Sequence, residues 1–156
     1  MAIKVGDHAP DFTLVSDDKS SITLSSYCNE SNVVLLFFPL AFTGVCTKEL
    51  CDMRDDIGKY EKFAAQVLAI SVDSVFTLNK FKTDQGFNFP LLSDFNKDVS
   101  RAYDALYEEF AFGMKGVSKR SAFVIDKQGV VQYAEVLENA GDLPNFSAVA
   151  TVLASL

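Results

Sequence analysis

The sequence has no tryptophan, a single histidine and only three cysteines, and these shortages exclude several kinds of protein. Because His8 is the one histidine and the Cys-x4-Cys spacing has no second ligand pair, a zinc site is not expected. An odd number of cysteines without an export signal is a poor basis for structural disulfides and favours a reducing compartment. The absence of tryptophan also removes the usual fluorescence probe of conformation.

Positive charge and long apolar runs are scarce as well. The chain has 14 Lys and Arg residues against 21 Asp and Glu residues, a formal net charge of −7. Its basic residues form no cluster, which argues against a nucleic-acid partner. The longest apolar run, Val33–Phe42, is too short to cross a bilayer and contains Pro39. Residues 1–14 lack the features of a secretory signal, so we expect a cytoplasmic protein without a membrane segment.

What is present is the composition of a globular protein. Hydrophobic residues make up 49% and charged residues 22% of the 156-residue chain, enough for one core of ordinary size. The sequence has no repeats, low-complexity stretches or linkers, so we expect a single domain that spans residues 1–156.

Polar–apolar alternation and short apolar runs predict the strands, and helical spacing of apolar residues predicts the helices. The expected strands are 11–15, 21–24, 33–38, 66–72, 90–93, 121–126 and 130–136. The expected helices are 43–60, 75–83, 98–106 and 144–154, the last with Pro144 as its first residue. Residues 33–38 are apolar on both faces, which is typical of a central strand covered by helices. This order predicts an α/β fold close to thioredoxin, with a central mixed sheet flanked by helices and an N-terminal β-hairpin.

The run Pro39-Leu-Ala-Phe-Thr-Gly-Val-Cys46 joins the central strand to the next helix. Cys46 falls in the first turn of that helix, where unpaired N–H groups and the helix dipole favour a negative charge. Since the thiolate is the nucleophilic form, this position indicates a reactive cysteine, whereas a buried cysteine on the helix stripe would be inert. Pro39 would shield the sulfur or simply end the strand. Thr43 would contact the sulfur or simply cap the helix.

Arg120 and Glu49 are the candidates for charged groups beside Cys46. Arg120 precedes a predicted strand, and if it points to Cys46 its guanidinium would stabilise a thiolate and a leaving oxygen. Glu49 lies one turn beyond Cys46 and could orient that guanidinium through a bidentate pair. The alternatives are a surface arginine and a solvated glutamate.

These residues together resemble the peroxiredoxins, thiol peroxidases of the thioredoxin superfamily. The motif is Pro39-x3-Thr43-x2-Cys46, with Glu49 after it and Arg120 far downstream. The segments 5–14 and 89–94 also look like that family, and the resemblance runs from about Val5 to Val136. Residues 37–46 are most similar to the one-cysteine alkyl hydroperoxide reductase E type and the bacterioferritin-comigratory-protein group.

The resemblance implies that Cys46 is the peroxidatic cysteine, whose thiolate attacks a hydroperoxide and becomes a sulfenic acid. It implies no metal, flavin or nicotinamide. Hydrogen peroxide, alkyl or lipid hydroperoxides and peroxynitrite are all compatible oxidants, and thioredoxin, glutaredoxin or a small thiol would be the reductant. The other roles that it implies are peroxide binding by Thr43 and Arg120, shielding by Pro39, orientation of the arginine by Glu49, and an N–H cradle from Val45 and Cys46.

Cys51 leaves the regeneration of Cys46 open. Five residues along a helix give about 7.5 Å of rise and about 140° of rotation, so the two thiols cannot bond while the helix is intact. Either the first turns unwind after oxidation, or an outside thiol reduces Cys46. Some bacterioferritin-comigratory members carry a resolving cysteine at this spacing, whereas the alkyl hydroperoxide reductase E likeness favours one-cysteine chemistry. We favour Cys51 as the resolving residue and interpret Cys28 as structural or as a second resolver.

Two other functions share a reactive cysteine. A thioredoxin-like disulfide oxidoreductase would need a second thiol near the helix start, normally as Cys-x-x-Cys, which residues 44–49 lack. A redox sensor or binding module would keep Cys46 but react slowly with peroxide. The resemblance also implies a homodimer, with Phe42 and other aromatic residues near the Cys46 loop at the interface.

Overall fold

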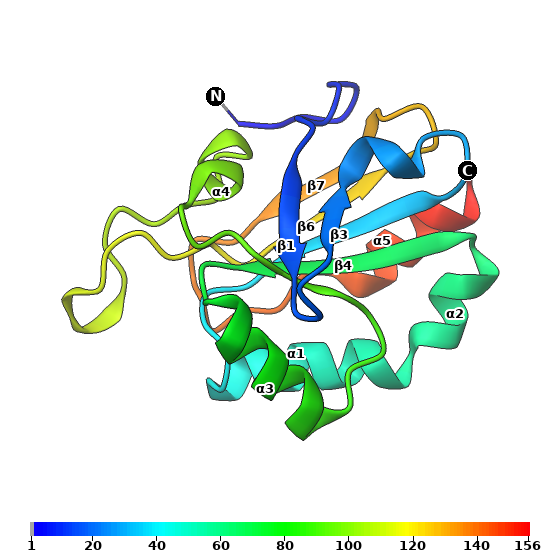
Figure 1. Ribbon diagram of the computed structural model, residues 1–156. Helices are drawn as coiled ribbons and strands as arrows, with labels where there is room; N and C mark the ends of the chain where they lie inside the picture. Colours follow the sequence, from blue (N-terminus) through cyan, green and yellow to red (C-terminus); the bar gives the residue numbers. More distant parts are fainter. Residues whose placement is uncertain (1) are drawn as a thin grey trace.

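Within residues 2–156, which the computed structural model describes, seven strands form one mixed sheet in the order β2-β1-β5-β4-β3-β6-β7 (Figure 1). β3, β4 and β5 are parallel, whereas β1 and β6 pair antiparallel with β5 and β3. The predicted hairpins are β1–β2 and β6–β7. The strands are β1 (Thr13–Ser16), β2 (Ser21–Thr23), β3 (Asn32–Phe37), β4 (Ala65–Ser71), β5 (Leu91–Ser93), β6 (Ser121–Ile125) and β7 (Val131–Val136).

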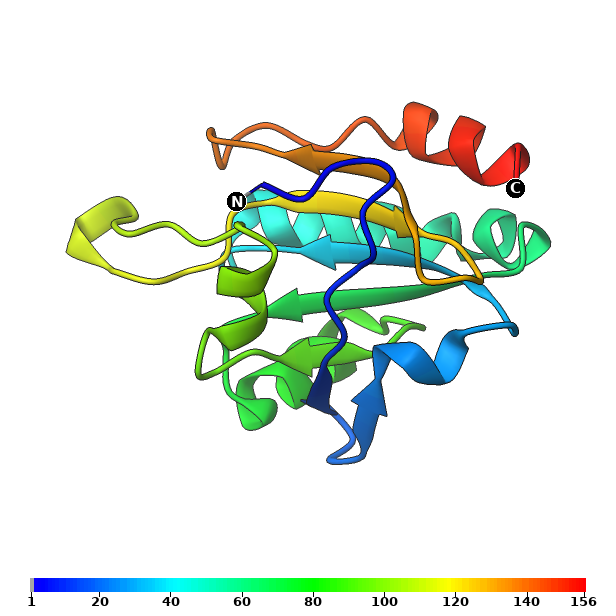
Figure 2. The same ribbon diagram turned by 90° about the horizontal axis from the view of Figure 1, so that it is seen from above.

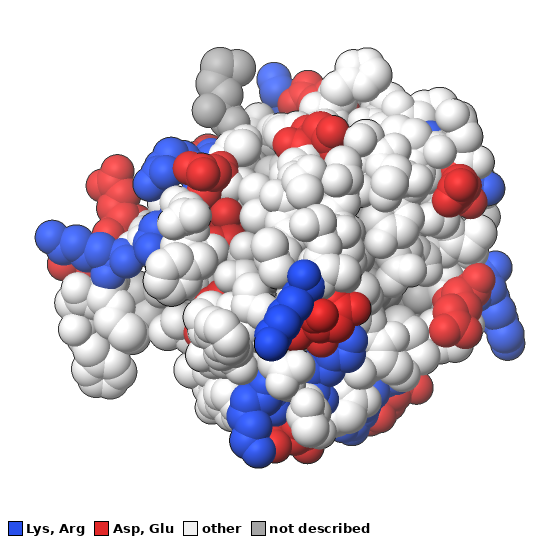
Figure 3. All heavy atoms as spheres, in the orientation of Figure 1, with Lys and Arg blue, Asp and Glu red and all other residues white. Residues whose placement is uncertain are grey.

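Helices cover this sheet, as the sequence predicted. They are α1 (Gly44–Asp55), α2 (Ile57–Lys62), α3 (Val75–Gln85), α4 (Asp98–Ala102) and α5 (Phe146–Ala154), with short 3-10 turns η1 (Leu24–Tyr27) and η2 (Ala111–Gly113). Figure 2 shows the N-terminal segment crossing in front of the sheet and α1 behind it. In the described part of the chain, every helix is too short or too polar to cross a membrane. On the face shown in Figure 3, acidic and basic side chains are mixed and form no continuous basic patch.

The central strand β3 is buried on both faces. Val34 and Leu36 pack in the hydrophobic cluster that includes side chains of α1, α3 and α5. Leu35 and Phe37 pack in a second cluster with side chains of the N-terminal segment and α4. Because successive side chains of a strand point to opposite sides, a strand between two covered faces must be apolar throughout. The predicted mixed α/β sheet with its N-terminal hairpin is therefore confirmed.

The parallel strands end at one edge of the sheet, where the segments that follow them meet. Ala41, which follows β3, donates its N–H to the Asp73 carboxylate, which follows β4 (2.8 Å). The Ser93 hydroxyl of β5 donates to the Asp73 carbonyl (2.6 Å). This carboxyl edge is where open α/β sheets place their sites.

The helix predicted from residue 43 to Tyr60 is divided at Asp56. Asp56 has φ −99° and ψ 6°, and its N–H donates to the carbonyls of Asp52 and Met53. Met53 and Tyr60 are both buried, so the apolar spacing continues across the break. A pattern of apolar residues alone does not reveal such a break.

The helix predicted at 98–106 is wrong in its second half, since α4 ends at Ala102. Asp104 has a left-handed conformation (φ 51°), and Leu106 forms an antiparallel bridge with Ser118. The long-range pairing of Leu106 therefore replaces the last helical turn.

Pro144 is not the first residue of the final helix. The Asn145 side chain accepts a hydrogen bond from the Ala148 N–H (3.0 Å) and caps α5, which begins at Phe146. Asparagine is among the strongest capping residues, so the helix begins after Asn145 and the proline lies before the cap.

Candidate functional site

The site lies where β3 ends and α1 begins, at the carboxyl edge of the sheet. Cys46 is the third residue of α1 and is 1% exposed. The first intrahelical-type bond of α1 runs from the Thr47 N–H to the Thr43 carbonyl (2.9 Å). The N–H groups of Val45 and Cys46 have no acceptor among residues 2–156. They are therefore donors available to an oxygen atom bound beside the sulfur.

The loop before α1 has an unusual backbone that its surroundings hold in place. Phe42 has φ 66°, a left-handed conformation that is uncommon for a large side chain. Its ring packs on Phe81 of α3 with ring centres 4.9 Å apart, and the N–H of Ala41 binds Asp73. Strained residues of this kind persist where neighbouring contacts determine them and are frequent at active sites.

Thr43 is the N-cap residue by position, but its hydroxyl does not cap the helix. It donates instead to the Leu40 carbonyl (2.8 Å), which closes the loop on itself. A hydroxyl held as a donor by a carbonyl keeps its oxygen lone pairs as acceptors. Thr43 can therefore accept a hydrogen bond from a protonated ligand while staying oriented.

Arg120 reaches Cys46 from the start of β6. Its Nη2 lies 3.3 Å from the Cys46 sulfur, and its Nη1 donates to Glu49 Oε1 (2.6 Å). Nε and Nη2 also donate to the Ala140 carbonyl, at 3.3 and 3.0 Å. Each side of the planar guanidinium therefore has a fixed partner, which leaves it one orientation. The structure thus brings Arg120, Glu49 and Cys46 together, but the expected bidentate pair is wrong, because only Oε1 of Glu49 accepts from Arg120.

Burial and the neighbouring charges act in opposite directions on Arg120 and Glu49. Burial opposes the charge of Arg120, but Glu49 and Cys46 beside it raise the pKa of the guanidinium above its ordinary value. Burial raises the pKa of Glu49 from its ordinary 4.5 to about 7, although Arg120 acts in the opposite direction. Glu49 Oε2 is buried and has no hydrogen-bond partner in the described chain. One permanent cation thus faces the carboxyl group of Glu49 and the sulfur of Cys46.

A small cavity of about 260 Å³ opens onto the sulfur. Its lining includes the expected Pro39, Thr43, Val45, Cys46 and Arg120, together with Gly44, Phe110, Ala140 and Gly141. The cavity thus presents a sulfur, a guanidinium and free backbone N–H donors to a small polar molecule.

Three parts of this site were not found from the sequence. Phe110 comes from the long loop between α4 and β6, and Ala140 contributes only its backbone carbonyl. Asp73 acts on the loop through the Ala41 N–H. A backbone carbonyl can come from any residue type, so the sequence does not identify the Ala140 acceptor. No short-range pattern connects Phe110 with Cys46 either. Asp73 could have been considered, because it directly follows a predicted buried strand.

The other two cysteines lie away from the cavity. Cys51 is partly buried, and its sulfur lies 3.5 Å from Gln85 Oε1 at the end of α3. Cys28 is exposed just after η1. All three cysteines are free, and the unbroken helix α1 separates Cys46 from Cys51.

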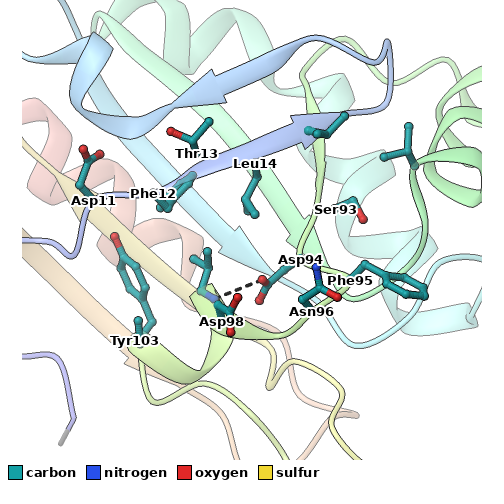
Figure 4. A pocket seen from close by; sticks show the side chains of 14 residues that line it. Asp11, Phe12, Thr13, Leu14, Ser93, Asp94, Phe95, Asn96, Asp98 and Tyr103 are labelled. Carbon is teal, nitrogen blue, oxygen red and sulfur yellow. Dashed lines mark hydrogen bonds between the residues drawn. The ribbon is translucent and has the colours of Figure 1, made fainter.

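A larger cavity of about 510 Å³ lies between β1 and α4, and two of its polar side chains, Asp94 and Tyr103, are already paired (Figure 4). The Asp94 carboxylate accepts hydrogen bonds from the N–H groups of Val99 (3.1 Å) and Ser100 (2.7 Å). The Tyr103 hydroxyl donates to the Pro10 carbonyl (2.7 Å). Its lining has no cysteine or histidine. Across residues 2–156, no group of three His, Cys, Asp or Glu side chains is arranged to hold a metal ion.

Comparison with known proteins gives a consistent result. The model of the AhpC/TSA family matches residues 5–134. Alkyl hydroperoxide reductase E of Mycobacterium tuberculosis is 42% identical over 136 residues, which cover 86% of this chain and 86% of the relative. The crystal structure of Peroxidoxin BcpB from Mycobacterium tuberculosis has a TM-score of 0.87 at 30% identity, covering 99% of this chain and 98% of that one. Xanthomonas campestris Peroxiredoxin Q has a TM-score of 0.82 at 28% identity, covering 98% and 96% of the two chains.

Replacing Glu49 by Gln should change how stability depends on pH. A raised pKa in the folded state stabilises the fold below the unfolded value of 4.5, and this contribution is lost as pH rises through about 7. Relative to Glu49→Gln, the wild type should therefore lose about 3 kcal/mol of unfolding free energy between about pH 4.5 and 7. Urea denaturation followed by circular dichroism measures both proteins. Parallel pH curves would contradict the assignment of a raised pKa to Glu49.

Proposed function

This chain belongs to the AhpC/TSA family, the peroxiredoxins, and we propose that it reduces hydroperoxides in a thiol cycle that begins at Cys46. As a member of that family it is a thiol-dependent peroxidase. The observation that supports Cys46 as the reacting residue is the 3.3 Å contact between its sulfur and the buried Arg120 guanidinium. The sulfur also faces a cavity of a size suited to a small oxidant.

The first step is attack of the Cys46 thiolate on one oxygen of the hydroperoxide. A sulfur–oxygen bond forms, the oxygen–oxygen bond breaks, and the leaving oxygen takes a proton and departs as water or an alcohol. Cys46 is oxidised to a sulfenic acid and the peroxide is reduced. Arg120 and the N–H groups of Val45 and Cys46 face the charge that develops on the oxygens, and Thr43 accepts from the peroxide O–H.

Pro39 and Glu49 support this step without reacting. Pro39 lines the cavity and limits the access of water to the sulfur. Glu49 holds Arg120 through the 2.6 Å bond to Nη1, so that Nη2 stays directed at Cys46.

We propose further that Cys51 resolves the sulfenic acid. In the folded enzyme Cys51 lies on α1, away from the cavity, so the first turns of α1 must unwind for the two sulfurs to meet. The Cys46–Cys51 disulfide would then be reduced by thioredoxin, glutaredoxin or a small thiol. A cytoplasmic location is part of this proposal, because the cytosol keeps such thiols reduced.

A homodimer is the proposed assembly. Three exposed phenylalanines follow the carboxyl ends of the three parallel strands: Phe42 (50% exposed) after β3, Phe76 (74%) after β4 and Phe95 (61%) after β5. Exposed apolar side chains that gather at one edge indicate an interaction surface. A second copy of the chain would cover them beside the active site.

Arg120→Lys should lower the rate of peroxide reduction by about 10²–10³, the cost of losing one donor from an oxyanion cradle. Lysine keeps a charge for Glu49 but cannot contact Glu49 and Cys46 at once. Stopped-flow mixing with hydrogen peroxide, followed by quantifying the remaining thiol, measures the rate. Lys119→Met is the matched control, since Lys119 pairs with Glu138 at the surface, and it should react like the wild type. A wild-type rate for Arg120→Lys would remove Arg120 from the mechanism.

Cys51→Ser should form the Cys46 sulfenic acid at the wild-type rate but no internal disulfide. Mass spectrometry with peptide mapping after one equivalent of peroxide distinguishes the products, and Cys28→Ser is the control. A wild-type protein that stays in the sulfenic acid state would instead indicate a one-cysteine enzyme reduced by an outside thiol.

Phe76→Asp should convert the dimer to a monomer, because a charge at this edge opposes burial of the apolar surface. Light scattering at micromolar concentration reports the mass. Val5→Asp, at an exposed residue of the N-terminal segment, serves as the control and should stay dimeric. A monomeric wild type would overturn the assembly.

A further inference from the structure

The two halves of α1 are held by different parts of the protein. The first half is tied to β6, because Arg120 contacts both Cys46 and Glu49. The second half is tied to the end of α3, where Arg54 Nη1 donates to the Gln85 carbonyl. The Arg54 carbonyl in turn accepts from the Asn88 side chain (3.2 Å). The two cysteines of α1 lie in different halves, so each has its own anchorage.

Cys51 lies within the second anchorage and is in contact with it. Its thiol donates to Gln85 Oε1 at 3.5 Å. Arg54 follows Cys51 by three residues and therefore lies on the same side of the helix. Arg54 also pairs with Asp55 (3.0 Å), and this hydrogen bond raises the pKa of Arg54. Cys51 thus has a fixed polar partner, and Arg54 holds the same end of the helix.

We propose that Gln85 and Arg54 position Cys51 as the resolving thiol. This inference rests on the proposed function, in which Cys51 attacks the oxidised Cys46. Gln85 accepts from the Cys51 S–H through Oε1, which fixes the direction of the sulfur. Arg54 holds the end of α1 against the end of α3 through its bond to the Gln85 carbonyl, and this tie keeps Cys51 beside Gln85.

The step that they assist is the attack of Cys51 on the oxidised Cys46. The Cys51 S–H releases its proton to solvent, and the thiolate attacks the Cys46 sulfur. The sulfur–sulfur bond forms, the bond from the Cys46 sulfur to its hydroxyl breaks, and the leaving hydroxide takes up a proton to become water. Cys51 is oxidised and the Cys46 sulfenic acid is reduced to the disulfide level.

The same anchorage determines which part of α1 moves. When Cys46 becomes a neutral sulfenic acid, the charge that it offered to Arg120 is gone, and the first half of α1 loses one of its ties. The ties of the second half to Gln85 and Asn88 do not involve Cys46 and remain. Cys51 is therefore the stationary partner, and residues 44–49 are the segment that unwinds toward it.

Rapid-quench mass spectrometry tests the proposal by following both steps, with dimedone trapping the Cys46 sulfenic acid. Gln85→Met keeps the length of the side chain but not its hydrogen bonds, and Gln85→Glu adds a negative charge beside the thiol. Both should leave sulfenic acid formation unchanged. Gln85→Met should slow disulfide formation by roughly fivefold to tenfold, the effect of one ordinary hydrogen bond. Gln85→Glu should slow it further, because the added negative charge repels the attacking thiolate.

Two variants of Arg54 test its tie to the Gln85 carbonyl. Arg54→Lys keeps a donor for the Gln85 carbonyl and should keep most of the disulfide rate, whereas Arg54→Met removes this tie and should slow disulfide formation. Gln128→Glu, which adds the same charge in the turn between β6 and β7, should behave like the wild type.

Disulfide formation at the wild-type rate in Gln85→Met and Gln85→Glu would overturn the inference and leave the peroxidase mechanism intact. Equal slowing of both steps would also overturn it, since that result indicates a general structural role. A wild-type protein that forms no Cys46–Cys51 disulfide would overturn the resolving role of Cys51, and this inference with it, while Cys46 oxidation would still stand.

Discussion

The active site depends on the buried guanidinium of Arg120, which contacts the Glu49 carboxyl group and the Cys46 sulfur at the same time. β6 runs antiparallel to β3, so the start of β6 lies beside the end of β3. Because α1 follows β3, the start of β6 also lies near the start of α1, and Arg120 can reach both Cys46 and Glu49. A buried arginine needs partners for its charge and its donors, and Glu49 and the Ala140 carbonyl supply them. The order of the strands thus places a permanent cation at the sulfur.

The proposed cycle places two opposite requirements on helix α1. Its first turn must be rigid while Cys46 attacks, since the N–H donors and the sulfur act in fixed positions. The same turn must then unwind if Cys51 is to form a disulfide with Cys46. The separate anchorages of α1, to β6 at one end and to α3 at the other, allow one half to move while the other stays. The helix is also interrupted at Asp56, so a change in α1 need not be transmitted to α2.

Local patterns in the sequence account for what was predicted. The continuous apolar run of β3 and the spacing from Pro39 to Cys46 lie within a few residues of sequence, so both could be predicted, and the α/β order followed from them. Features that depend on residues distant in sequence could not be predicted. The helix predicted at 98–106 was shortened by the bridge of Leu106 to Ser118, and the Ala140 carbonyl reaches Arg120 through tertiary packing alone. The contact of Gln85 with Cys51 is of the same kind.

The environment of a thiol, and not its exposure to solvent, selects the cysteine that reacts first. Cys46 is 1% exposed, whereas Cys28 is exposed to solvent. Rapid mixing of the reduced protein with substoichiometric hydrogen peroxide, followed by quenching and peptide mapping, identifies the residue that gains the first oxygen. This oxygen should appear on Cys46. First oxidation at Cys28, or no oxidation within seconds, would contradict the assignment of Cys46 as the reacting thiol.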